Sequence, residues 1–197
     1  MQRLFLGPLL ATALIVPSLT AASTWNIDSA HSSAQFAVRH LMVSTVRGNL
    51  GTVSGVVTLD ESDITKSTVE ATIDAAGIDT RDAKRDDHLR SPDFLDTAKY
   101  PTITFKSTKV EQVTPTSYKV TGDLSMHGVT KPVVLTVEGS PKPIADPFGK
   151  TRMGGSATTT ITRQDFGINW SKSLDGGGLV VGNDVDVTID LEVTQQK

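Results

Sequence analysis

The sequence predicts an all-β protein, an antiparallel barrel of about eight strands with one helical insertion near residues 79–96. Three observations support this fold class. Short segments in which apolar and polar residues alternate recur along the chain, as is typical of strands with one buried face. Links that contain glycine and proline, such as "HGVTKP" (127–132), join neighbouring segments and favour hairpins. One stretch, 77–101, lacks the alternation and carries residues that cap helices.

The first 23 residues have the pattern of an export signal. Arg3 is followed by an apolar run over residues 4–19 and then by small residues. The run is short for a membrane span and contains two prolines, which disfavours a permanent anchor. We therefore expect residues 1–23 to be a signal peptide that is removed, and residues 24–197 to form a single exported, soluble domain.

Composition excludes several classes of protein. The chain has 197 residues, a formal net charge of −3 and no cysteine. Disulfides, a cysteine nucleophile and a thiolate metal site are therefore impossible. The chain has no basic tract, so nucleic-acid binding is not expected.

The predicted strands follow one another with little between them. After a first strand that begins near Trp25, the alternating segments in chain order are 33–41, 46–60, 68–74, 102–108, 117–128, 132–139, 156–167 and 185–193. Glycines inside the second of these segments suggest bulges or sharp bends. Two stretches rich in glycine or proline, 140–155 and 173–184, are predicted to be long loops.

The helical insertion has its own signals. Asp79 or Thr80 can cap a helix near residues 81–90, with acidic residues in its first turn. This helix is mostly charged and is expected at the surface. Phe94 and Leu95 are the expected inward anchors, which would let the insertion plug one end of the barrel.

The last predicted strand, "VDVTIDLEV" (185–193), alternates without a miss and raises the question of what its apolar face contacts. Side chains alone barely fill a barrel of eight strands. Aromatic residues make up only 5% of this chain, and small inward side chains would leave an apolar space suited to a lipid tail. A flattened sandwich with a filled core fits the same pattern, so alternation leaves both possibilities open.

Four stretches, "WNIDSAHSSAQFAVRHLMVSTVRGNLGTVSGVVTLD", "RDDHLRSPDFLDTAKYPTITFKST", "GDLSMHGVTKPVVLTV" and "RQDFGI", together resemble the YceI-like family. The resemblance covers nearly all of the chain after the signal. It implies an exported bacterial protein with an extended lipocalin-like barrel that binds polyisoprenoid lipids. A polyprenyl phosphate or an isoprenoid quinone would lie in an apolar tunnel in the periplasm, for storage or transfer. We expect no cofactor besides the bound lipid, and a homodimer formed through a barrel edge is compatible with the sequence.

Strand phase selects the residues expected to line this tunnel. They are Phe36, Val38, Leu50, Val69, Ile73, Phe94, Phe105, Leu124, Leu135, Phe166, Ile189 and Leu191. An error of one residue in phase would turn a whole strand's side chains outward.

Two polar residues are candidates for a lipid head group. His40 shares a face with Phe36 and Val38 and can point inward at a barrel end. Arg163 can contact an anionic group, because guanidinium suits phosphate. The alternative for Arg163 is a structural contact with Asp165 that supports a turn.

No catalytic or metal motif stands out. The four histidines lie in separate segments and have none of the spacings typical of metal ligands. No serine lies in a nucleophile motif. We therefore predict a binding protein and not an enzyme, with no metal. Two alternatives remain: an accessory of an oxidoreductase or hydrolase whose histidines act on a bound lipid or quinone, and a filled barrel that binds another exported protein.

Overall fold

The computed structural model describes residues 22–175 and 177–196. The predicted signal peptide, residues 1–23, therefore lies outside the described residues except for its last two positions. No helix in the described part of the chain combines the length and the apolar character that crossing a bilayer would require.

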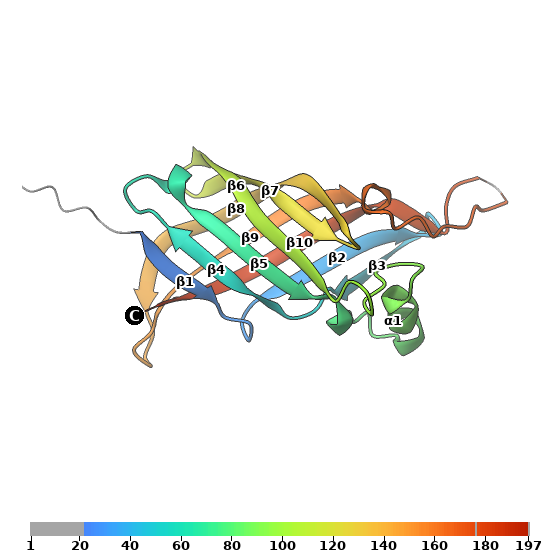
Figure 1. The fold of residues 1–197 in the computed structure, drawn as a ribbon, viewed down its shortest axis with the longest axis horizontal. Coiled ribbons are helices and arrows are strands. Elements are labelled where there is room, and N and C mark those ends of the chain that lie inside the picture. The colour runs from blue at the N-terminus through green and yellow to red at the C-terminus, as the bar shows by residue number, and fades with distance from the viewer. Residues whose placement is uncertain (1–21, 176, 197) are drawn as a thin grey trace, which may run out of the picture.

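The described residues form ten strands and one α-helix (Figure 1). The strands are β1 (Ser23–Ile27), β2 (Ser33–His40), β3 (Ser44–Asn49), β4 (Val53–Leu59), β5 (Thr68–Asp74), β6 (Thr102–Thr114), β7 (Ser117–Met126), β8 (Val129–Ala145), β9 (Thr151–Thr162) and β10 (Val181–Gln195). The helix α1 spans Ala83–Arg90, and short 3-10 turns cover Ile64–Lys66, Ala75–Gly77 and Arg163–Phe166.

The sheet closes on itself. Each strand from β4 to β10 pairs antiparallel with the next, and β1 pairs with both β4 and β10. β2 also pairs with β10, over residues 181–190, which precede the residues that pair with β1. β1 and β2 therefore share one position in the barrel, and β3 and β4 share the next. The result is a closed antiparallel barrel with eight strand positions. The predicted barrel is confirmed. The pairing of β1 with β10 closes the sheet and excludes the flattened sandwich.

A glycine allows the bend between β3 and β4. Gly51 has a φ of +128°, and a Cβ at this position would lie 1.9 Å from the backbone oxygen of Asp74. Only a residue without a side chain fits both the conformation and the space. This bend lets the chain leave its pairing with β2 and continue in its pairing with β1.

One predicted loop is wrong. Residues 140–155 were expected to form a long connection, but β8 continues to Ala145 and β9 begins at Thr151. The prolines that suggested a loop, at positions 141 and 143, lie where the register between β8 and β9 shifts. A bulge tolerates proline because its residues do not all donate to the ladder, so strand and proline coexist here.

The helical insertion lies at one end of the barrel (Figure 1). Its helix falls within the predicted range, but its cap is Asp82, whose side chain accepts from the backbone N–H of Arg85. Asp86 was expected at the surface and is buried, because it accepts hydrogen bonds from the backbone N–H and the hydroxyl of Thr80. Phe94 and Leu95 are buried in the core, as predicted.

Candidate functional site

An apolar cavity of about 350 Å³ lies inside the barrel. All eight strand positions contribute to its wall, through β2 and β4–β10. The sequence left open what the apolar face of the last strand contacts. In the structure this face of β10 lines the cavity through Val181, Val185, Val187, Ile189, Leu191 and Val193. The barrel is therefore hollow and its core is not filled. Because the cavity follows the apolar face of β10, we refer to it as the tunnel.

Most of the residues that strand phase selected lie in the wall of the tunnel. Of the twelve predicted residues, eleven line the tunnel: Phe36, Val38, Leu50, Val69, Ile73, Phe94, Phe105, Leu124, Leu135, Ile189 and Leu191. The exception is Phe166, which ends the 3-10 turn that follows β9. Its side chain is buried in the core cluster that also contains Met126 and Ile168. The predicted alternating segment continued to residue 167, but β9 ends at Thr162, so the strand phase does not extend to Phe166.

The wall includes two groups of residues that strand phase could not select. Ile78, Leu89 and Leu95 reach the tunnel from the helical insertion. Gly154 and Gly155 line it from β9, opposite Gly139 of β8. The glycine pair in the sequence was the only signal for this part of the wall, and it was interpreted as a loop.

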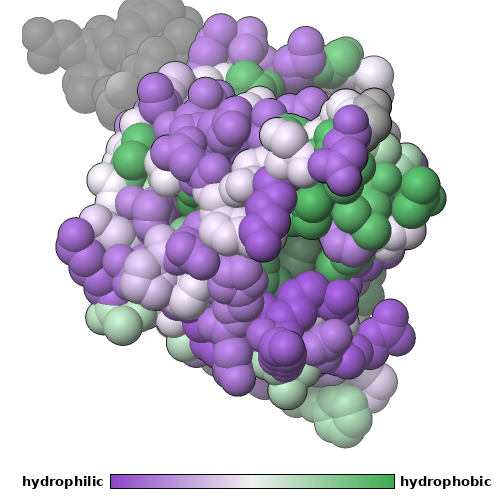
Figure 2. Space-filling model, turned by 90° about the vertical axis from the view of Figure 1, so that its right-hand side faces the viewer, coloured by the Kyte–Doolittle hydropathy of each residue, from purple (hydrophilic) through white to green (hydrophobic). Residues whose placement is uncertain are grey.

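A second, smaller cavity of about 180 Å³ adjoins the tunnel at the α1 end. Figure 2 faces this end and shows a hollow with hydrophobic walls inside a largely hydrophilic rim. The small cavity shares Phe36, Val38, Leu89, Phe94 and Val181 with the tunnel, and its other lining residues include Arg39, His40, Arg85, His88 and Trp170. His40 thus lies beside the tunnel and not in its wall.

Arg163 is buried at the edge of the tunnel, but its donors already have partners. Its guanidinium donates five hydrogen bonds, to the carbonyls of Gly182, Ile168, Trp170 and Val181 and to Oδ1 of Asn183. Asp165, the expected partner, is exposed. The predicted contact with Asp165 is therefore wrong, because Arg163 instead ties the segment after β9 to the start of β10. Its contact with a head group stays a prediction. Burial lowers the pKa of this guanidinium.

Comparison with known proteins identifies the family. The model of the YceI-like domain matches residues 25–193. The chain belongs to the YceI-like family. A UPF0312 protein of Vibrio parahaemolyticus is 41% identical over 163 residues, which cover 81% of this chain and 85% of that protein.

Solved structures agree on the fold of this YceI-like chain. The crystal structure of the Campylobacter jejuni YCEI protein superposes with a TM-score of 0.68 at 31% identity, covering 81% of this chain and 90% of that one. A polyisoprenoid binding domain from Saccharophagus degradans superposes with a TM-score of 0.62, covering 87% of this chain and 98% of that one. Its 16% identity supports a shared fold alone.

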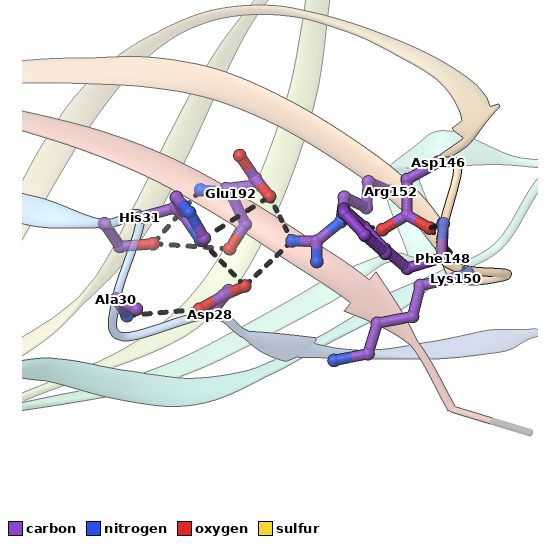
Figure 3. Close-up of polar contacts among 9 residues, drawn as sticks. Asp28, Ala30, His31, Asp146, Phe148, Lys150, Arg152 and Glu192 are labelled. Atoms are coloured by element: carbon purple, nitrogen blue, oxygen red, sulfur yellow. Dashed lines mark hydrogen bonds and ion pairs between the residues drawn. The ribbon is translucent and has the colours of Figure 1, made fainter.

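The opposite end of the barrel carries a network of charged side chains (Figure 3). Arg152 of β9 donates to Asp28 at 2.8 Å, to Asp146 at 2.6 Å and to Glu192. His31 Nδ1 lies 3.0 Å from Asp28 Oδ2. Hydrogen bonds from Arg152 and His31 lower the pKa of Asp28 to about 2, and those from Arg152 lower the pKa of Asp146. The network joins β9, β10, the 146–150 loop and the link between β1 and β2.

Part of this network has the geometry of a metal site. Ligand atoms of Asp28, His31 and Glu192 lie within 4.8 Å of one another. However, Arg152 donates to both carboxylates, so a cation bound here would have to displace a guanidinium. The arrangement fits an ion-pair network better than a metal site.

The four histidines lie outside the wall of the tunnel. All four are among the described residues, and none of them lines the tunnel. His31 belongs to the charged network, and His127 Nδ1 lies 3.0 Å from the carbonyl oxygen of Phe166. His88 Nε2 lies 2.9 Å from Asp93 beside the small cavity, which also contains His40. The tunnel therefore offers apolar contacts, and no imidazole is present in its wall.

Proposed function

We propose that this chain binds a polyisoprenoid-type lipid, such as a polyprenyl phosphate or an isoprenoid quinone, and holds it for storage or transfer. The observation that carries the proposal is the apolar tunnel along the barrel, with lining residues from every strand position. Membership of the YceI-like family supports the choice of ligand class, and the domain of the same fold from Saccharophagus degradans is described as a polyisoprenoid binding domain.

The length of the tunnel favours a long tail. On β10 its wall runs from Val181 to Val193, about twelve residues that rise about 3.3 Å each and so span about 40 Å along the strand. With the tilt of about 40° that is usual for barrel strands, this corresponds to about 30 Å along the barrel axis. A whole bilayer has a hydrocarbon core of about 30 Å, whereas one acyl chain occupies a single leaflet. A polyprenyl tail therefore fits better than one fatty acyl chain.

Burial of the tail supplies the binding energy. Each buried methylene contributes about 0.8 kcal/mol, so a tail of several isoprene units needs no polar contact to be retained. The barrel would replace the bilayer as the solvent for the tail. The guanidinium of Arg163 already donates to backbone carbonyls. We therefore expect a head group to lie at the small cavity, beside His40, and not at Arg163.

We infer that the protein works outside the cytoplasm, in the periplasm, and that it is not an enzyme. The export pattern of residues 1–23 supports the location, and the absence of histidines from the tunnel wall supports a binding role. The bound lipid would be the only small molecule required. A homodimer remains a proposal that analytical ultracentrifugation would test.

The accessory-enzyme alternative depends on His40 and His127. His127 Nδ1 lies 3.0 Å from the carbonyl oxygen of Phe166, whereas His40, at the end of β2, lines the small cavity and is the residue to test. If the protein turns over a bound quinone or lipid, His40→Ala should reduce that turnover while leaving the bound lipid in place. Finding no turnover in the unmodified protein would remove this alternative.

Native mass spectrometry tests the proposed function. The mature protein is purified from the periplasm of its own source, its intact mass is recorded, and whatever accompanies it is extracted into organic solvent. We expect a stoichiometric adduct that extracts as an isoprenoid, on a polypeptide that begins near Ser23. A protein that has no adduct, and gains none after incubation with polyprenyl phosphates and quinones, would contradict the proposal.

A further inference from the structure

An exposed apolar tip projects from the α1 end of the barrel. It is the turn between β2 and β3, formed by Leu41, Met42 and Val43, whose exposed fractions are 39%, 54% and 78%. Three consecutive large apolar side chains in water are costly, and such patches often mark sites of interaction. We refer to Leu41, Met42 and Val43 as the apolar tip.

The backbone of the apolar tip is not one that these residues favour. Leu41 and Met42 have φ angles of 51° and 61°, and the N–H of Val43 donates to the carbonyl of His40 at 3.1 Å. Two consecutive left-handed residues make a hairpin turn that sequences usually build from Asn-Gly. Leucine and methionine are strained in this conformation. Folding alone therefore does not explain why these side chains occupy the turn.

The apolar tip lies next to the small cavity that adjoins the tunnel. The N–H of Leu41 donates to the carbonyl of Val180, and Val180 lines the small cavity. That cavity shares five lining residues with the tunnel. Figure 2 shows hydrophobic surface extending from the hollow to one side of the rim. A lipid tail that enters or leaves at this end could pass along apolar surface without entering water.

The β2–β3 hairpin that carries the apolar tip has a positive formal charge. Arg39 and Arg47 flank it on β2 and β3, and no acidic residue lies between Asp28 and Asp60 in the sequence. Arg39 donates to the carbonyl of Met42 at 2.7 Å, which holds this cation at the turn. In the neighbouring loop Lys172 and Asp175 offset each other. An apolar turn flanked by arginines matches a bilayer surface that carries anionic phosphate groups.

We propose that the apolar tip docks the α1 end of the barrel on an anionic lipid bilayer, where the tunnel exchanges its ligand with the membrane. This inference rests on the proposed function, since an insoluble isoprenoid must come from a bilayer. The contact is reversible, because the buried area amounts to a few side chains. It is a surface contact, in which the side chains of the apolar tip reach the headgroup boundary.

Vesicle flotation tests the docking directly. The mature protein is mixed with vesicles of phosphatidylcholine alone or of phosphatidylcholine with phosphatidylglycerol, both without isoprenoid. We expect association with the anionic vesicles, weakened by added salt as the two arginines are screened. The double variant Leu41→Asn/Met42→Gly should associate at least about tenfold more weakly, since two apolar side chains are lost.

This double variant also controls for folding. It places favourable residues at both left-handed positions, so its melting temperature should equal or exceed that of the unmodified protein. Its isoprenoid adduct should be unchanged, while transfer of the lipid between vesicles should slow. Phe148→Ser is the matched control, because Phe148 is 87% exposed in the loop between β8 and β9, and its loss should leave flotation unchanged.

The outcomes separate docking from lipid binding. Equal flotation of the unmodified protein and the double variant, or flotation with neither vesicle, would overturn the docking proposal even if an isoprenoid adduct is present. A dimer that the double variant disrupts would assign the apolar tip to a second copy and would also overturn it. Flotation lost in the double variant, in a protein that never carries an isoprenoid, would support docking while refuting the proposed function.

Discussion

The two ends of the barrel are built differently. At the end near the chain termini, Trp25 is fully buried among apolar side chains, and Arg152 links three carboxylates from separate segments. At the α1 end, every N–H of Arg163 bonds to an oxygen of a nearby segment. Both ends use an arginine as a connector. One joins charged side chains at the surface, and the other satisfies buried oxygens.

Backbone strain also separates the two ends. The described residues other than glycine that have positive φ are Leu41, Met42, Arg81, Asp96 and His127. All of them lie in the β2–β3 turn, the helical insertion or the β7–β8 turn, which are at the α1 end (Figure 1). Strained backbone often clusters at functional sites, and here it lies at the end of the barrel that contains the small cavity. The end near the termini closes the sheet, and the α1 end carries the features that exchange would need.

The largest effect is expected from Trp25→Ala. The side chain has no exposed area and packs with Ile27, Val53 and Leu59, so its removal leaves a cavity at the end near the termini. We expect the free energy of unfolding to fall by about 4 kcal/mol in urea denaturation. Val113→Ala, at a position that is 57% exposed, serves as the control and should change it by less than about 0.5 kcal/mol. A similar small change for Trp25→Ala would show that this end does not anchor the fold.

Arg163→Met should have the next largest effect. It leaves the carbonyls of Ile168, Trp170 and Gly182 without their donor, at a cost of about 3 kcal/mol in the free energy of unfolding. Hydrogen exchange followed by mass spectrometry should show faster exchange in residues 167–184 and little change near β1. Uniform change across the barrel would contradict a local role for Arg163.

The acid dependence of stability tests the network at the other end. The pKa of Asp28 is lowered to about 2 in the folded protein, so its contribution is complete above about pH 4 and is lost as the pH falls toward 2. After allowance for solvent screening, we expect Asp28→Asn to lower the free energy of unfolding by about 1 kcal/mol at pH 7. Urea denaturation near pH 2 should show a much smaller difference between the two proteins. A difference that does not depend on pH would mean that the charge of Asp28 is not what stabilises this end.

Features that repeat along the chain could be predicted from the sequence. Alternation in β10 and its neighbours is a local signal, so it located both the strands and the residues that face inward. It failed for Phe166, which lies in a 3-10 turn, and for β8 and β9, where the prolines sit at a bulge within a continuing strand. Both errors arose where local backbone geometry departs from the regular strand.

Features that depend on contacts between distant residues could not be predicted. The partners of Arg152 come from residues 28, 146 and 192, and no spacing in the sequence relates them. Closure of the barrel depends on the pairing of β1 with β10, the first and last strands. The partners of Arg163 are mostly backbone carbonyls. Every residue has a backbone carbonyl, so residue type cannot predict which of them Arg163 contacts. The choice between a hollow and a filled barrel required this three-dimensional information.

The most direct test of the central claim, that a lipid occupies the tunnel, compares two neighbouring positions on β8. Leu135 lines the tunnel, whereas Val134 is 48% exposed on the outer face. Native mass spectrometry should show that Leu135→Trp loses most of the isoprenoid adduct, because the indole fills the space of the tail, while Val134→Trp retains it. Equal adducts on both variants would show that the lipid is bound elsewhere, and the account would be wrong.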